Sequence, residues 1–103
     1  MDRRYALRFL PLFSEDLNEA VDYIAVVLQN PDAAMKLIDD VEDAIHRRLQ
    51  SPEAFEPFHS RRQREHPYYR IGVGNYIVFY VVIGDVMEVR RLLYSGRDWH
   101  KML

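Results

Sequence analysis

The 103-residue sequence contains no cysteine. Disulfide bonds, thiolate catalysis and cysteine-based zinc sites are therefore excluded. There is also no glycine-rich phosphate loop, because Gly72 and Gly74 are followed by a strand pattern rather than by a helix. The four histidines lie far apart without paired ligand spacing, so we expect no metal site and no cofactor. They are His46, His59, His66 and His100.

Long apolar runs are missing as well, and none approaches the roughly 18 residues that a membrane span needs. Met1 is followed directly by a charged, mixed segment. We therefore expect a cytoplasmic protein that is neither secreted nor inserted into a membrane. A length of 103 residues suits one core, so residues 1–103 are expected to form a single domain.

The net charge of −2 hides an asymmetry between the two halves of the chain. Residues 1–56 hold 12 acidic and 6 basic residues, whereas residues 57–103 hold 4 acidic and 8 basic residues. The halves therefore carry −6 and +4. The C-terminal half is the candidate for binding an anionic partner, although ordinary solvated surface can carry the same charge.

Two segments have the apolar period of amphipathic helices. The first is predicted to start at Ser14 as its cap and to end before Pro31, and the second to follow a cap at Asp32 and end near Pro52. The short connection predicts an antiparallel hairpin whose two apolar stripes are both buried in the core. The stripes comprise Leu17, Ala20, Val21, Ile24, Val27 and Leu28 in the first helix, and Ala34, Leu37, Ile38, Val41, Ala44, Ile45 and Leu49 in the second.

The rest of the chain predicts strands. Residues 4–11 favour a short strand closed by proline, and residues 68–73, 76–83 and 86–94 predict an antiparallel meander with tight turns between the strands. The middle strand is almost wholly apolar and should be buried on both faces. We therefore predict an α+β fold of order β-α-α-β-β-β, with a helical hairpin on one face of a small, mainly antiparallel sheet and the other face partly open.

Arginines and aromatic residues are interleaved in the basic half, from a proline-punctuated loop at residues 52–67 to the tail. Guanidinium groups bind phosphates and carboxylates, and aromatic rings stack on bases, so the set suits single-stranded RNA or an acidic protein segment. Surface ion pairs to Glu65, Asp85, Glu88 and Asp98 explain it equally well. Simple alternation places Glu88 and Arg90 on one side of their strand and Arg91 on the other. The set comprises Arg61, Arg62, Arg64, Arg70, Arg90, Arg91 and Arg97, with Tyr68, Tyr69, Tyr94 and Trp99.

A series of short fragments is spread over nearly the whole chain: FSEDL (13–17), YI (23–24), NPDAA (30–34), LQSPE (49–53), YRI (69–71), NYIVFY (75–80), VRRLL (89–93) and RDW (97–99). In this order and spacing, the fragments resemble the RelE/ParE superfamily of type II toxin–antitoxin toxins. The resemblance implies a toxin that a cognate antitoxin neutralises, usually across its sheet and helical surface. RelE-like members cut mRNA on the ribosome, whereas ParE-like members target DNA gyrase.

The resemblance leaves the nuclease residue set incomplete. Arg70 and Arg97 match basic positions of RelE-like members, but Ile77 stands at the basic position of the middle strand. Leu103 falls at the tail position of the active-site tyrosine. Arginine stabilises charge well but moves protons poorly, since its pKa lies above about 12. Another group would have to move the proton.

We therefore expect a ParE-like growth inhibitor that acts on DNA gyrase. The alternatives are a RelE-like nuclease, acting with the ribosome and mRNA, and an inactive antitoxin-binding relative. In a nuclease the catalytic set would be Arg70, Arg97, Tyr94 and His66. The expected partner-binding residues are Arg61, Arg62, Arg64, Arg90 and Arg91.

Overall fold

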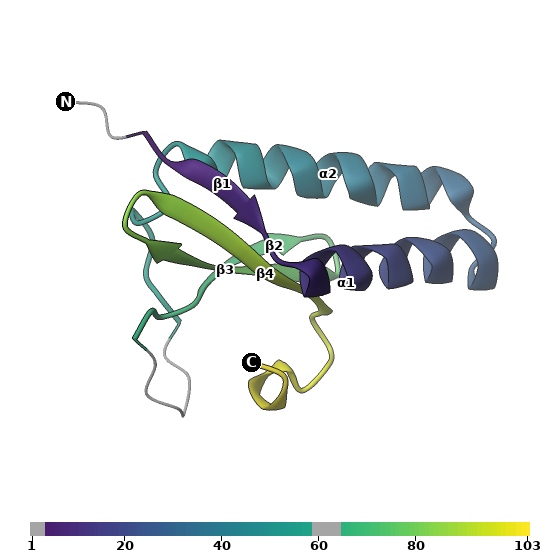
Figure 1. The fold of residues 1–103 in the computed structure, drawn as a ribbon. Coiled ribbons are helices and arrows are strands. Elements are labelled where there is room, and N and C mark those ends of the chain that lie inside the picture. Colours follow the sequence, from purple (N-terminus) through teal and green to yellow (C-terminus); the bar gives the residue numbers. More distant parts are fainter. Residues whose placement is uncertain (1–3, 59–64) are drawn as a thin grey trace.

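The computed structural model describes residues 4–58 and 65–103. A helical hairpin lies beside a four-stranded sheet, and a short helical turn ends the chain (Figure 1). The elements in chain order are β1 (Ala6–Phe9), α1 (Pro11–Asp22), a π-helical turn η1 (Tyr23–Val27), α2 (Pro31–Leu49), β2 (Tyr69–Val73), β3 (Tyr76–Ile83), β4 (Val86–Tyr94) and a 3₁₀ turn η2 (Trp99–Lys101).

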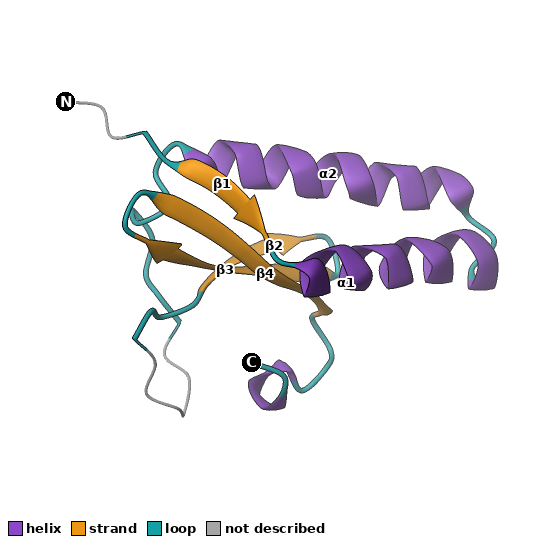
Figure 2. Cartoon of the chain, in the orientation of Figure 1, coloured by secondary structure: helices purple, strands orange, loops and turns teal. Residues whose placement is uncertain are grey.

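The sheet has the order β1-β4-β3-β2. β2, β3 and β4 form the predicted antiparallel meander, and β1 pairs in parallel with β4. Gly74 and Gly84 have φ values of +57° and +59°, the left-handed conformation that tight hairpin turns require and glycine adopts without strain. The helices pack on one face of the sheet, as Figure 2 shows. The predicted α+β fold and element order are therefore confirmed.

Both helix starts differ from the prediction. α1 begins at Pro11 rather than at Ser14, and α2 begins at Pro31. Proline fits the first helical position because its fixed φ suits the helix and its missing N–H would have no partner there. The side chain of Asn30, rather than that of Asp32, caps α2 by accepting a hydrogen bond from the backbone N–H of Ala33 at 3.1 Å. The prolines therefore start helices instead of only ending the segments before them.

The centre of β3 is buried on both faces, as predicted. Val78 and Tyr80 face the helices, and Phe79 and Val81 face the opposite side, all with no exposed surface. The helices supply the cover on the first side. On the second side, the face predicted to be partly open carries a smaller core, against which parts of the loop and tail pack: Phe58, Trp99, Met102 and Leu103.

A buried hydroxyl fixes the chain where it leaves α2. Tyr80 donates a hydrogen bond to the carbonyl of Pro52 at 2.8 Å and accepts one from Arg48 at 3.0 Å. The Arg48 guanidinium also lies 3.5 Å from the centre of the Phe55 ring. Burial is the main reason why the pKa of Tyr80 is raised, so the hydroxyl stays a donor at neutral pH. These contacts hold residues 52–55 against the sheet.

The apolar stripe of the first helix is not buried along its whole length, which corrects the prediction. Ala20 is buried, but Val27 and Leu28 are 64% and 55% exposed. The backbone N–H of Leu28 bonds to the carbonyl of Tyr23 five residues back, so the π-helical turn changes the period of the stripe. The hairpin also projects beyond the sheet, which leaves its far end without cover (Figure 1).

Candidate functional site

A β-bulge in β4 sets the direction of its arginines. Phe79 of β3 pairs with Arg91, and Tyr80 pairs with Val89, so Arg90 is an extra residue without a partner in the register. Because Phe79 faces away from the helices, Arg91 does too. Arg91 therefore lies on the same side as Glu88, and the predicted separation of the two is wrong because the bulge interrupts the alternation.

Glu88 is a buried carboxylate between two arginines. It is 5% exposed and accepts hydrogen bonds from the Nε atoms of Arg8 at 2.7 Å and Arg90 at 2.9 Å. Burial by itself would raise the pKa of Glu88, but the two guanidinium groups outweigh it and the pKa is lowered. Two positive charges meet one negative charge, so the group leaves a net positive charge on the sheet face.

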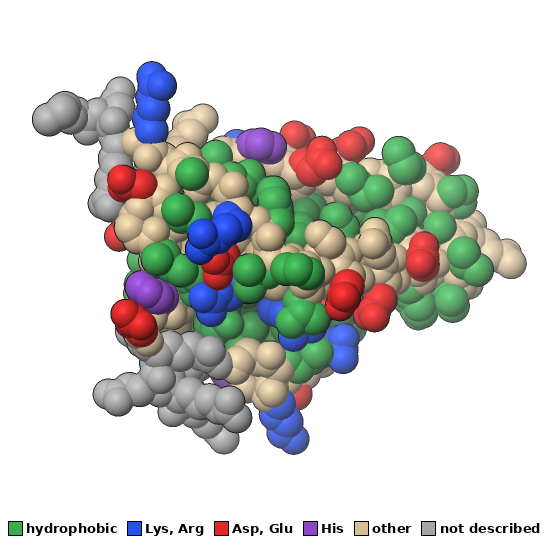
Figure 3. Space-filling view, in the orientation of Figure 1, with side chains coloured by type: hydrophobic (Ala, Val, Ile, Leu, Met, Phe, Trp, Pro, Cys, Tyr) green, Lys and Arg blue, Asp and Glu red, His purple; other side chains and the backbone are tan. Residues whose placement is uncertain are grey.

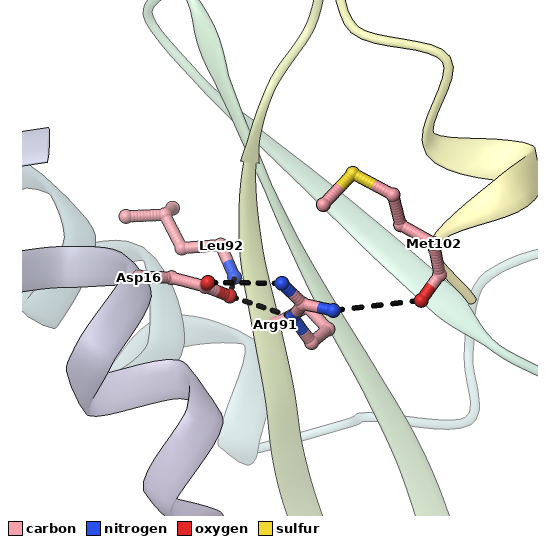
Figure 4. Close-up of polar contacts among 4 residues, drawn as sticks. All are labelled: Asp16, Arg91, Leu92 and Met102. Carbon is pink, nitrogen blue, oxygen red and sulfur yellow. Dashed lines mark hydrogen bonds and ion pairs between the residues drawn. The ribbon is translucent and has the colours of Figure 1, made fainter. Parts of the chain in front are cut away.

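Arg91 ties α1, β4 and the tail together (Figure 4). Its Nε and Nη2 atoms donate to the two oxygens of Asp16 at 2.7 and 3.0 Å, and its Nη1 donates to the carbonyl of Met102 at 3.4 Å. Asp16 also accepts from the backbone N–H of Leu92 at 3.0 Å. The hydrogen bonds that Arg91 donates to Asp16 are the main cause of its raised pKa. Arg90 and Arg91 therefore both form ion pairs. The partner of Arg91, Asp16, was not predicted from the sequence.

Arg70 lies on the same sheet face and is exposed. It stands opposite Phe79 in the register, with its guanidinium carbon 5.4 Å from the ring centre of Phe58 and 5.9 Å from that of Trp99. Trp99 stacks on His100 with the ring centres 4.0 Å apart. A cation beside aromatic rings can bind a carboxylate, a phosphate or a planar ring.

A groove lies between the helical hairpin and the end of the sheet, with a volume of about 800 Å³. It contains Tyr94 and Arg97, so these two predicted residues are brought together. Tyr94 packs edge-on to Tyr76 at 5.9 Å between ring centres. The groove is lined by Asp16, Glu19, Ala20, Tyr23, Ile24, Leu28, Asn30, Ala33, Asn75, Tyr76, Leu92, Tyr94 and Arg97.

The four residues of the predicted nuclease set do not form one cluster. Tyr94 pairs with Tyr76, which packs on the helical side, whereas Arg70 points to the opposite face. The nearest acidic partner of His66 is its neighbour Glu65, at 4.0 Å. Of the predicted binding residues, three lie outside the described part of the chain: Arg61, Arg62 and Arg64.

Residues 4–58 and 65–103 contain no group of three or more histidine, aspartate or glutamate side chains placed to hold a metal ion. Within that same part of the chain, no helix combines the length and apolar character that crossing a membrane requires.

A helical hairpin on one face of a four-stranded mixed sheet defines the RelE/ParE type of α+β fold. A family model described as the ParE toxin of the type II toxin–antitoxin system parDE matches residues 7–99. This chain therefore belongs to the ParE toxin family. No curated protein matches the sequence.

Two solved structures share the fold. One, from the chromosomal ParDE toxin–antitoxin system of P. aeruginosa, has a TM-score of 0.74 at 16% identity, over 91% of this chain and 99% of that chain. The other, from the archaeal RelE–RelB complex of Pyrococcus horikoshii OT3, has a TM-score of 0.52 at 19% identity, over 94% of this chain and 99% of that chain. At such identities the likeness shows the fold alone.

The buried Glu88 should make stability depend on pH. Its pKa is lowered from 4.5 on folding, so its contribution is present above that value and is lost as pH falls through the lowered pKa. We expect Glu88→Gln to lower the free energy of unfolding by about 2 kcal/mol at neutral pH, because hydrogen bonds to a charged group are lost.

Urea unfolding of the wild type and of Glu88→Gln, at neutral pH and at about pH 3, measures this effect. The difference between their free energies of unfolding should shrink at the lower pH. The exposed Glu15 provides a matched control, since Glu15→Gln should leave stability nearly unchanged at both pH values. A constant difference for Glu88→Gln would contradict the role of its ionised form.

Proposed function

We propose that this ParE-family chain acts in the cytoplasm, where a cognate antitoxin neutralises it and where, once free, it inhibits growth by binding DNA gyrase. The match to the ParE toxin family over residues 7–99 carries the proposal. The separation of Arg70 from Tyr94 across the sheet supports it, because a nuclease would need these groups around one phosphate.

The antitoxin segment should be mainly acidic and should bind across the sheet face and the groove. Arg8, Arg90 and Arg70 leave positive charge on the sheet face, and Arg97 stands at the groove. A disordered acidic segment would gain charge-assisted hydrogen bonds there as it orders. The predicted role of residues 61–64 in this interface stays a prediction. Salt should weaken the complex.

Arg70 and Arg97 are the arginines that we expect to contact a partner directly, because both are exposed. Arg91 already uses three nitrogens on Asp16 and Met102, so its role is mainly to hold the surface together. In a gyrase inhibitor these residues would bind and would not catalyse. Loss of the planar guanidinium fork in Arg70→Lys and Arg97→Lys should therefore weaken activity even though the charge remains.

Inducing the chain without antitoxin, and adding the purified protein to a gyrase supercoiling assay, tests the proposal. We expect arrested growth, a DNA-damage response and inhibited supercoiling, all reversed by the antitoxin. Tyr94→Phe should leave the inhibition intact, because it removes only a hydroxyl.

Two results would contradict the gyrase proposal, and a third would change only its binding residues. Stalled translation with mRNA ends in the ribosomal A site, together with loss of toxicity in Tyr94→Phe, would indicate the nuclease. Normal growth would indicate an inactive relative. Toxicity that survives both Arg70→Ala and Arg97→Ala in folded protein would remove these two residues from the site.

A further inference from the structure

The far end of the helical hairpin exposes large apolar side chains. Val26 is 72% exposed, Val27 64% and Met35 60%. Val26 and Val27 lie in η1, and Met35 lies in the second turn of α2, on either side of the connection between the helices. Figure 3 shows hydrophobic side chains gathered at this projecting end. Contiguous exposed apolar patches rimmed by polar residues are typical of protein interaction surfaces.

Acidic side chains flank the apolar ones. Asp22 lies four residues before Val26, and Asp39 lies four residues after Met35, so each is a neighbour on its helix. Both carboxylates are exposed, and neither has an ion-pair partner among residues 4–58 and 65–103. We call Asp22, Val26, Val27, Met35 and Asp39 the hairpin tip.

Acidic residues predominate around the hairpin tip. Residues 22–39 hold three acidic residues and one basic residue. The one lysine, Lys36, is already paired with Asp40 at 2.6 Å. A second copy of this chain would bring two such surfaces together and is disfavoured by like-charge repulsion. An acidic antitoxin segment is disfavoured for the same reason.

We propose that the hairpin tip is the surface with which the free toxin binds its target protein, and that the target contributes a segment with apolar side chains flanked by lysine or arginine. Apolar contact would supply affinity, and the carboxylates would select the basic partner. Antitoxin in the adjoining groove, which includes Tyr23 and Leu28 of the same hairpin end, would obstruct the target. The inference rests on the proposed toxin activity but not on the identity of gyrase.

Two matched double variants test this proposal in the full-length chain. Asp22→Lys with Asp39→Lys reverses charge at the hairpin tip, and Glu15→Lys with Asp43→Lys makes the same charge change elsewhere on the hairpin, at exposed residues. A third variant, Val27→Ser with Met35→Ser, removes apolar surface alone. All of these side chains are exposed, so thermal melting should find every variant folded.

Growth inhibition without antitoxin is the main measurement, with antitoxin affinity by calorimetry and gyrase supercoiling beside it. Both tip variants should need at least about tenfold more induced protein to arrest growth, while the control matches the wild type. Antitoxin affinity should stay within about twofold in all of them, because the tip side chains lie outside the groove.

The outcomes separate the two proposals. If the wild type is toxic and leaves gyrase unaffected, but the tip variants lose toxicity, gyrase is not the target and the proposed role of the hairpin tip is supported. Gyrase inhibition that persists unchanged in both tip variants would overturn the tip and uphold gyrase. An equal loss of toxicity in the control variant would also overturn the proposed role of the hairpin tip, as would a loss of antitoxin affinity in the tip variants. A wild type without toxicity would overturn both proposals.

Discussion

Replacing Asp16 by alanine should lower the free energy of unfolding by about 3 kcal/mol, which is a large part of the stability of a small protein. The Asp16 and Arg91 side chains are only 10% and 16% exposed, so the arginine would be left partly buried without its counter-charge. The backbone N–H of Leu92 would lose its acceptor as well. Asp16 also positions Arg91, which donates a hydrogen bond to the carbonyl of Met102. Without Asp16 this contact would weaken and the tail would be released.

Chemical denaturation of Asp16→Ala measures this effect, and Asp40→Ala supplies the matched control. Asp40 forms an ion pair with Lys36 on the exposed side of α2, with the lysine side chain 74% exposed. Such pairs contribute less than about 1 kcal/mol because water screens them. If the two variants were equally stable, the Asp16–Arg91 contact would be an ordinary surface pair rather than the link between α1, β4 and the tail.

The three C-terminal strands could be predicted to within a residue because their signals are local. Gly74 and Gly84 mark the turns, and the apolar residues between them form the buried middle strand. The parallel pairing of β1 with β4 joins residues about 80 positions apart, and no local pattern encodes it. Helix starts were predicted less well, since Pro11 ends an extended segment and begins a helix equally well in sequence terms.

The candidate site could be predicted in part. Ion pairing of the arginines with Glu88 was one of two alternatives that the sequence left open, and the alternation of the strand placed Arg90 on the same side as Glu88. Asp16 lies 75 residues from Arg91, so its partner could not be read from spacing. The bulge at Arg90 was missed as well, because the sequence there carries no glycine or other sign of irregularity. That bulge decides which arginines share a face.

Two leucines from the predicted apolar stripes should respond very differently to truncation. Leu37 is 8% exposed in the core between α2 and the sheet, so Leu37→Ala should lower the free energy of unfolding by about 3 kcal/mol through lost burial and the cavity left behind. Leu28 is 55% exposed where the hairpin projects beyond the sheet, so Leu28→Ala should change stability by no more than about 0.5 kcal/mol.

Urea unfolding of both variants under one set of conditions makes the comparison, with the same atoms removed in each case. The π-helical turn and the overhang of the hairpin are the physical reasons for the difference, because a straight helix over a longer sheet would bury both leucines. Similar losses for the two variants would mean that the projecting end of the hairpin is covered by protein in solution. In that case Val26 and Val27 could not be free to contact a target, and the docking surface at the hairpin tip would have to be abandoned along with the overhang.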